Sequence, residues 1–163
     1  MGAAYEGLRV DASGDRLVIT LDRPEVRNAI DTAMADSLHL VCAQLERDPR
    51  PAIFTGGPNI FAAGADIAEL RQRGRLEALT GTNSGLFDRI SRLPMPTVAA
   101  VAGPAIGGGA ELAYARDFRI GTPPGHGAGT ARCGAGTDGG RDLPSLEAVD
   151  EAVSQPRSSS PSR

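Results

Sequence analysis

Short apolar strands alternate with amphipathic helices through residues 1–121, and this alternation most narrows the folds open to the chain. In chain order the pattern predicts two strands, a helix, a strand, two helices, a strand, a helix and a strand. Alternation of this kind is typical of α/β domains, in which a helix crosses over between neighbouring parallel strands. We therefore predict an α/β fold built from crossover units.

The first two strands are predicted at residues 8–12 and 16–21, with a turn between them. Apolar residues then recur every three or four positions from Ile30 to Leu45, which indicates one face of a helix, and Asp31 lies near its start. An extended loop is expected at Asp22–Glu25. The other predicted strands are residues 52–55, 98–101 and 118–120. A second helix is predicted to start at Asp66, because Asp66 and Glu69 have the spacing of a capping box. Two more helices are predicted at residues 76–93 and 110–115.

The alternating pattern stops after Gly121. Residues 1–121 contain 35 large apolar side chains (Ile, Leu, Val, Met, Phe and Tyr), whereas residues 122–163 contain 4. A segment with so few large apolar residues cannot bury a core. We predict one domain at residues 1–121 and a disordered tail, rich in Gly, Pro, Ser and Arg, at residues 122–163. A short helix over Pro144–Val153 remains an open alternative within that tail.

Charge and cysteine usage exclude several classes of function. The net charge is −3 and the 17 basic residues, all arginine, form no dense run, so we expect no nucleic-acid partner. Cys42 and Cys133 are far apart, and His39 and His126 are isolated, so we expect neither a disulfide nor a metal site. Residues 93–110 carry no charge but contain three prolines and four glycines, which favours a strand, turn and helix over a membrane span. With no signal peptide visible, we expect a cytoplasmic protein.

Two glycine clusters invite phosphate-binding interpretations that the sequence does not support. Gly107–Gly109 lacks the Gly-Lys-Ser/Thr ending of a P-loop. Residues 134–139 match G-x-G-x-x-G, but no strand precedes them and no apolar helix follows, and the dinucleotide-binding motif requires both.

A different pair of segments has the features expected of a catalytic site. Residues 61–67 and 106–111 each lead into a predicted helix through small residues, which leaves peptide N–H groups free and accessible. If the two helix starts converge, they form an oxyanion hole with Glu111 beside it as general base or acid. Simpler interpretations stay open: Asp66 only caps a helix, the glycines only allow close packing, and Glu111 only complements a helix dipole.

Four segments, in this order, resemble the enoyl-CoA hydratase/isomerase (crotonase) family. They are residues 21–30 (LDRPEVRNAI), 61–67 (FAAGADI), 96–112 (PTVAAVAGPAIGGGAEL) and 117–120 (DFRI). The resemblance implies a crotonase-like spiral of β-β-α units, here incomplete at the C-terminus, and an acyl-CoA or enoyl-CoA thioester as substrate. It also implies a homo-oligomer, a trimer or a hexamer.

The resemblance also assigns roles to single residues. The peptide N–H groups of Ala65 and Gly108 would bind the thioester oxygen, and Glu111 matches the first catalytic glutamate. Coenzyme A enters as part of the substrate, so no separate cofactor is expected. The positions that would hold the coenzyme A and acyl portions are Arg27, Ala29, Ala63, Asp66 and Ile67.

One family feature is missing from this sequence. The family places its second catalytic glutamate in a Phe-Gly-x-Pro-Glu type segment soon after the Arg-Ile strand, but residues 122–135 contain no acidic residue. The first hypothesis is therefore an enoyl-CoA hydratase-like enzyme of fatty-acid β-oxidation with an altered or truncated C-terminus. The alternatives are a single-glutamate isomerase, or a non-catalytic fragment or subunit that needs a downstream companion chain.

Overall fold

A five-stranded sheet forms the centre of the computed structural model, which describes residues 5–12, 14–72, 82–121 and 133–134. Its strands lie in the order β1 (Leu8–Asp11), β2 (Leu17–Leu21), β3 (Ala52–Thr55), β4 (Thr97–Val101) and β6 (Phe118–Gly121). β1 pairs with β2 antiparallel, and the other neighbours are parallel. The parallel pairs confirm the predicted α/β fold with crossover connections.

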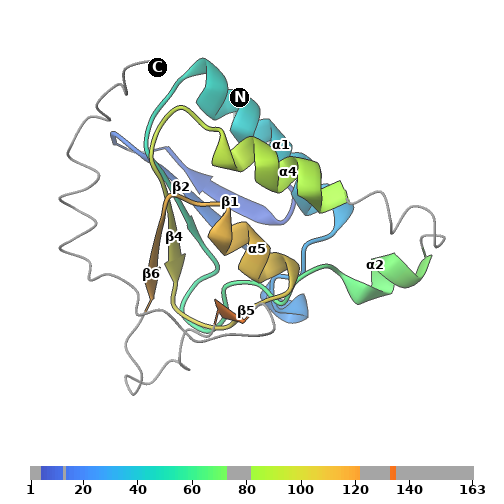
Figure 1. Cartoon of the computed structure of the whole chain (residues 1–163). Coiled ribbons are helices and arrows are strands. Elements are labelled where there is room, and N and C mark those ends of the chain that lie inside the picture. Colours follow the sequence, from blue (N-terminus) through green and yellow to red (C-terminus); the bar gives the residue numbers. More distant parts are fainter. Residues whose placement is uncertain (1–4, 13, 73–81, 122–132, 135–163) are drawn as a thin grey trace, which may run out of the picture.

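The helices α1 (Thr32–Arg47), α4 (Thr82–Ser91) and α5 (Gly108–Tyr114) lie on one side of this sheet, and α2 (Ile67–Gln72) stands apart from it (Figure 1). Alternate residues of β2 and β3 face these helices. The side chains of Leu17, Ile19 and Phe54 are fully buried there. Burial of a large apolar side chain contributes about 1.5–3 kcal/mol, so this layer holds the sheet and helices together.

The structure corrects two predicted boundaries. The loop at Asp22–Glu25 is not fully extended, because Pro24–Val26 forms a 3-10 helix that begins at the φ angle fixed by Pro24. Helix α5 begins at Gly108, two residues before the predicted start, since Gly107 adopts φ +52° as its N-cap. Part of the predicted helix 76–93 lies outside the described residues, and α4 covers Thr82–Ser91 of it.

Short segments after the main strands form a second set of pairings that the sequence pattern did not predict. β5 (Ala105–Ile106) pairs parallel with β7 (Cys133–Gly134), and single bridges join Ala62 to Ala105 and Ile30 to Ala65. Each turn of the chain therefore runs from a long strand through a short paired segment to a helix, which is a β-β-α unit. β7 falls within the predicted tail and ends at the first glycine of residues 134–139, so the expectation that no strand precedes that match is wrong. The other residues of the tail, Pro144–Val153 included, lie outside the described part.

A row of apolar residues crosses the sheet face opposite the helices. Val18 pairs with Ile53, Ile53 with Val98, and Val98 with Phe118, so the four side chains stand next to one another on adjacent strands. We call these four residues the outer row. Val98 is 4% exposed and the other three are half-buried, so the row is only partly covered by the described residues, whereas parallel sheets are almost always covered on both faces.

Candidate active site

Three segments lie side by side where the chain leaves β2, β3 and β4. Phe61 N–H donates to the carbonyl of Pro104 (3.0 Å), and Ile106 N–H donates to that of Ala62 (3.0 Å). On the other side, Ile30 N–H donates to the Gly64 carbonyl (2.7 Å). The structure thus brings residues 27–30, 61–66 and 104–108 together at the carboxyl ends of parallel strands, where α/β folds commonly bind ligands.

Glycine allows these backbones to approach closely. Gly64 adopts φ +98°, and a Cβ there would lie 2.9 Å from the Ile106 carbonyl oxygen and 3.4 Å from the Gly108 nitrogen. A Cβ on Gly109 would lie 2.4 Å from the Ala62 carbonyl oxygen. Small residues at these positions are therefore required by the contact between the two segments, whatever ligand they hold.

The peptide N–H groups of Ala65 and Gly108 have no hydrogen-bond acceptor among the described residues. Ala65 is bridged to Ile30 through its neighbours: Gly64 accepts from Ile30, and Asp66 N–H donates to the Ile30 carbonyl (3.0 Å). The N–H of Ala65 itself therefore points away from Ile30. Gly108 is the first residue of α5, where no earlier helical carbonyl is available.

Glu111 lies in the first turn of α5 and is exposed. Its N–H donates to the Gly107 carbonyl (3.0 Å), which fixes the backbone of this turn three residues after Gly108. Two apolar side chains near these segments are also exposed, Ile67 at 64% and Ile106 at 52%. Free N–H groups, a carboxylate and exposed apolar side chains on adjoining segments suit a ligand with a polar head and an apolar part.

Asp66 caps α2, as the simpler interpretation expected. Its Oδ1 accepts from the N–H of Ala68 (3.0 Å) and, more weakly, from that of Glu69 (3.4 Å). The Glu69 half of the predicted capping box is wrong, because its carboxylate instead accepts from the Thr32 N–H (2.9 Å) and the Thr32 hydroxyl. The competing partner lies at the start of α1, far away in sequence.

The other residues assigned to coenzyme A and acyl binding lie along the same paired segments. Arg27 is exposed with φ +56°, and its carbonyl accepts from the Ala63 N–H (3.0 Å). Ala29 is 9% exposed, and its carbonyl accepts from the Arg23 guanidinium (2.8 Å). The five predicted binding residues therefore lie on the segment that carries Ala65 or on the segment paired with it.

Two polar residues that the sequence pattern does not single out, Arg23 and Asn28, support these paired segments. Asn28 is 1% exposed at φ +54°, and its Nδ2 donates to the carbonyls of Gly56 (2.9 Å) and Phe61 (3.2 Å). Its Oδ1 accepts from the Arg23 N–H (2.9 Å). Both residues belong to the segment 21–30 on which the family resemblance rests, but nothing in the local pattern shows which distant carbonyls they reach.

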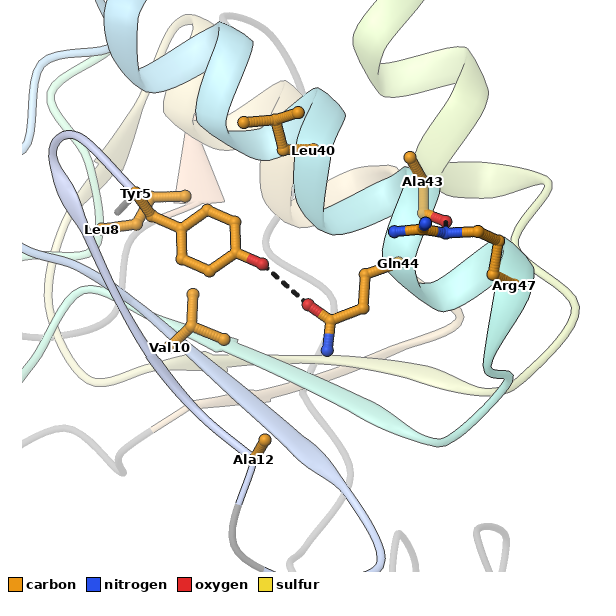
Figure 2. Close-up of a pocket in the computed structure, with 8 residues that line it drawn as sticks. All are labelled: Tyr5, Leu8, Val10, Ala12, Leu40, Ala43, Gln44 and Arg47. Carbon is orange, nitrogen blue, oxygen red and sulfur yellow. Dashed lines mark hydrogen bonds between the residues drawn. The ribbon is translucent and has the colours of Figure 1, made fainter. Parts of the chain in front are cut away.

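A hollow of about 590 Å³ lies between β1 and α1, away from these segments (Figure 2). Tyr5 donates a hydrogen bond to Gln44 Oε1 (2.7 Å) across it. The lining residues are Tyr5, Leu8, Val10, Ala12, Leu40, Ala43, Gln44 and Arg47. None of them belongs to the candidate site, and no carboxylate stands among them.

Arg116 is a buried cation outside the candidate site. It is 3% exposed, its guanidinium carbon lies 3.6 Å from the centroid of the Phe54 ring, and none of its side-chain nitrogens has a hydrogen-bond partner within the described part of the chain. Burial lowers the pKa of Arg116 to about 9. Burial likewise raises the pKa of the free thiol of Cys42 to about 11.

Two other kinds of feature are absent from the described ranges. No three His, Cys, Asp or Glu side chains there are placed to share a metal ion. None of the helices described in those ranges has the length and apolar character needed to cross a bilayer.

Comparison with known proteins identifies the family. The model of the enoyl-CoA hydratase/isomerase family matches residues 13–137. An enoyl-CoA isomerase/hydratase of Mycosarcoma maydis is 40% identical over 114 residues, which are 63% of this chain and 42% of that protein. An enoyl-CoA hydratase of Mycobacterium leprae, named as probable, is 35% identical over 118 residues, 71% of this chain and 46% of its own length.

Solved structures agree with the sequence comparison. The enoyl-CoA hydratase of Bacillus anthracis superposes with a TM-score of 0.68 at 30% identity, covering 71% of this chain and 47% of that one. Pseudomonas aeruginosa PA4980 superposes with a TM-score of 0.65 at 38% identity, covering 74% and 54%. The chain thus spans about half the length of these relatives. On the matched residues and the shared crotonase fold, the chain belongs to the enoyl-CoA hydratase/isomerase family.

Proposed function

We propose that this chain binds acyl-CoA thioesters and stabilises the enolate formed from them. The observation that carries the proposal is the pair of free N–H groups, Ala65 and Gly108, on segments that the Gly64 contact holds together. Two converging peptide N–H groups are the usual means of holding a developing oxyanion, and removal of one such donor commonly costs about 100- to 1,000-fold in rate. Ala63, Asp66 and Ile67 on one side, with Arg27 and Ala29 on the other, would border the coenzyme A and acyl portions.

The carboxylate of Glu111 would act as the acid/base group. With the thioester oxygen between the two N–H groups, Glu111 removes a proton from the carbon next to the carbonyl, the electron pair moves to the oxygen, and the proton returns to carbon. In the related hydratases, a second glutamate shares the task of adding water across a 2-trans-enoyl-CoA. A single base suffices for proton exchange or for moving a double bond, so these are the reactions this chain supports best.

A deuterium-exchange experiment tests this function. Butyryl-CoA incubated with the protein in D₂O is expected to gain deuterium at the carbon next to the thioester carbonyl, measured by proton NMR. Glu111→Gln should slow the exchange by about 100- to 10,000-fold while binding persists, because the base is lost and the oxyanion donors remain. Asp36→Asn removes an exposed carboxylate on α1 and serves as the control, with exchange expected at the wild-type rate.

Hydration is expected to be slow with this chain alone. Crotonyl-CoA should be hydrated roughly 100- to 10,000-fold more slowly than by a relative that has both glutamates. Hydration at a relative's rate, abolished by Glu111→Gln, would show that one glutamate is enough and would contradict the assignment. Absence of both binding and exchange would contradict the proposed function as a whole.

The outer row supports a second proposal, that a polypeptide partner completes this domain. The four residues Val18, Ile53, Val98 and Phe118 form an apolar band on the face of a parallel sheet away from the helices, and such faces normally carry a second layer. The relatives are about twice as long as the matched region, so the occupant we propose is a companion chain that carries the part of a family member this chain does not match.

Coexpression with the unmatched part of the Mycobacterium leprae relative tests this partner. We expect a one-to-one complex by light scattering, with hydration of crotonyl-CoA restored. Ile53→Glu in the outer row should abolish the complex, whereas Leu40→Glu, at a residue 53% exposed on α1, should leave it intact. A trimer of this chain alone that Ile53→Glu dissociates would instead identify a second copy as the occupant.

A further inference from the structure

One guanidinium joins the starts of α1 and α2. Arg23 Nη1 lies 2.8 Å from the carboxylate of Asp31, the N-cap of α1, and Nη2 lies 3.5 Å from that of Asp66, which caps α2. These three side chains are 21%, 22% and 15% exposed, so water screens their charges only in part. Without the cation, two partly buried carboxylates would face each other unpaired.

This ion cluster lies next to the peptide of Ala65 in the chain. Asp66 directly follows Ala65 in the chain, and its N–H donates to the Ile30 carbonyl. Arg23 also donates to the carbonyl of Ala29, the residue before Ile30 (2.8 Å). The Arg23 side chain therefore contacts both segments joined by the Ile30–Ala65 bridge, and this bridge turns the N–H of Ala65 away from Ile30.

Neighbouring polar contacts brace Arg23 from the other side. Its own N–H donates to Asn28 Oδ1, and the amide of Asn28 reaches the carbonyls of Gly56 and Phe61, where the segment 61–66 begins. Glu69 of α2 accepts from Thr32 of α1, which is a second link between the two helix starts. Figure 1 shows α2 away from the sheet and its helices, so its placement depends on contacts of this kind.

We propose that Arg23 is a positioning residue of the candidate site: by bridging Asp31 and Asp66 it fixes the direction of the Ala65 N–H. The proposal rests on the proposed function, since it assigns that N–H to the thioester oxygen. Arg23 itself touches neither the reacting carbon nor the base. Loss of the Arg23 side chain should therefore reduce polarisation of the thioester carbonyl and the rate of deuterium exchange. Most of the binding affinity for butyryl-CoA should remain.

Carbon-13 NMR of bound butyryl-CoA labelled at the thioester carbonyl measures this polarisation directly. Wild-type protein should move the carbonyl signal downfield, because hydrogen bonds to the oxygen withdraw electron density from the carbon. Arg23→Met should lose more than half of that shift and about tenfold in the maximal exchange rate, with the dissociation constant changed by less than about threefold. Arg23→Lys, which keeps the charge but not the fork of donors, should restore part of the shift.

Two further variants keep the test decisive. Arg89→Met removes another arginine ion pair, with Glu46 (2.7 Å), far from the site, and should lower stability without changing the carbonyl shift. Asp66→Asn keeps an oxygen to cap α2 but loses the charge, so it should act like Arg23→Met even if that variant fails to fold.

The outcomes separate the two proposals. A carbonyl shift in the wild type that both Arg23→Met and Asp66→Asn retain would overturn the positioning role alone. The absence of any shift in the wild type would overturn the oxyanion function and the positioning role with it. Loss of the shift in Arg89→Met as well would show that general destabilisation is the cause, and would also overturn the positioning role.

Discussion

Arg116→Met is expected to raise the free energy of unfolding by about 3 kcal/mol and the melting temperature by roughly 10 °C. The guanidinium is buried with no hydrogen-bond acceptor for any of its nitrogens among the described residues, so folding removes it from water without replacement. Burial lowers the pKa of Arg116 to about 9, which marks a large desolvation penalty on the charged form. Its contact with the ring of Phe54 offsets about 2 kcal/mol of this. Methionine fills similar space without the charge.

The stability gained by Arg116→Met should decrease as the pH rises. Because the folded-state pKa of Arg116 is the lower one, the unfolded chain binds more protons above pH 9, and the stability of the wild type relative to the variant rises with pH there. The advantage of Arg116→Met should be constant below pH 9 and should shrink as the pH rises above 9. Cys42 acts in the opposite sense, since its raised pKa makes folding less favourable as pH increases from 9 to 11, and its pKa should rise further in Arg116→Met because the Arg116 charge lowers it in the wild type.

Urea unfolding at pH 7 and pH 10.5 measures both effects. Arg92→Met is the matched control, because Arg92 is 80% exposed beside Asp88 and its loss should change stability by less than about 0.5 kcal/mol. A variant Arg116→Met that is no more stable than wild type at pH 7 would mean that Arg116 has an acceptor or water in solution.

Gly109→Ala is expected to destabilise the protein by about 3 kcal/mol or more and to abolish binding of butyryl-CoA. Its Cβ would lie 2.4 Å from the Ala62 carbonyl oxygen and 2.7 Å from the Ala62 Cβ. The carbonyl of Ala62 already accepts from Ile106 (3.0 Å), so it cannot move aside without breaking the pairing of the two segments. Overpacking against backbone is among the costlier single changes.

The same substitution at Gly85 is expected to have the opposite effect on stability. Gly85 lies within α4 and is exposed, and a Cβ at this position would meet no heavy atom of the described residues within 4 Å. Alanine there should raise stability by up to about 1 kcal/mol, since glycine is a poor helix former. Thermal unfolding and titration with butyryl-CoA check both variants, and wild-type stability in Gly109→Ala would contradict the close approach of residues 61–66 and 104–108.

Much of the fold could be predicted because its signals are local. The spacing of Ile30, Met34, Leu38, Val41 and Leu45 specified α1, and Asp31 caps it by accepting from the Met34 N–H (2.8 Å). Alternating burial in β2 and β3 likewise follows from the order of residues. The matched motifs also placed Ala65, Gly108 and Glu111 in their segments.

The remaining features depend on partners far away in the chain. The same local pattern allowed Glu69 to close a capping box, but Thr32 is its partner in the folded chain. The short pairings of Ile30 with Ala65 and of Ala62 with Ala105 have no periodicity, since each joins single residues. The burial of Arg116 against Phe54 also joins residues on different strands and turns.

The sequence by itself therefore determined the kinds of elements, their approximate limits and the family. Hydrophobic period and capping act within a few residues, so they can be read from the order of the side chains. Only the tertiary structure decided that residues 61–66 lie between two other segments, that the N–H groups of Ala65 and Gly108 stay free of acceptors in the described part of the chain, and that Arg23 links the starts of α1 and α2. Those features are set by hydrogen bonds and charges that meet only once the chain has folded.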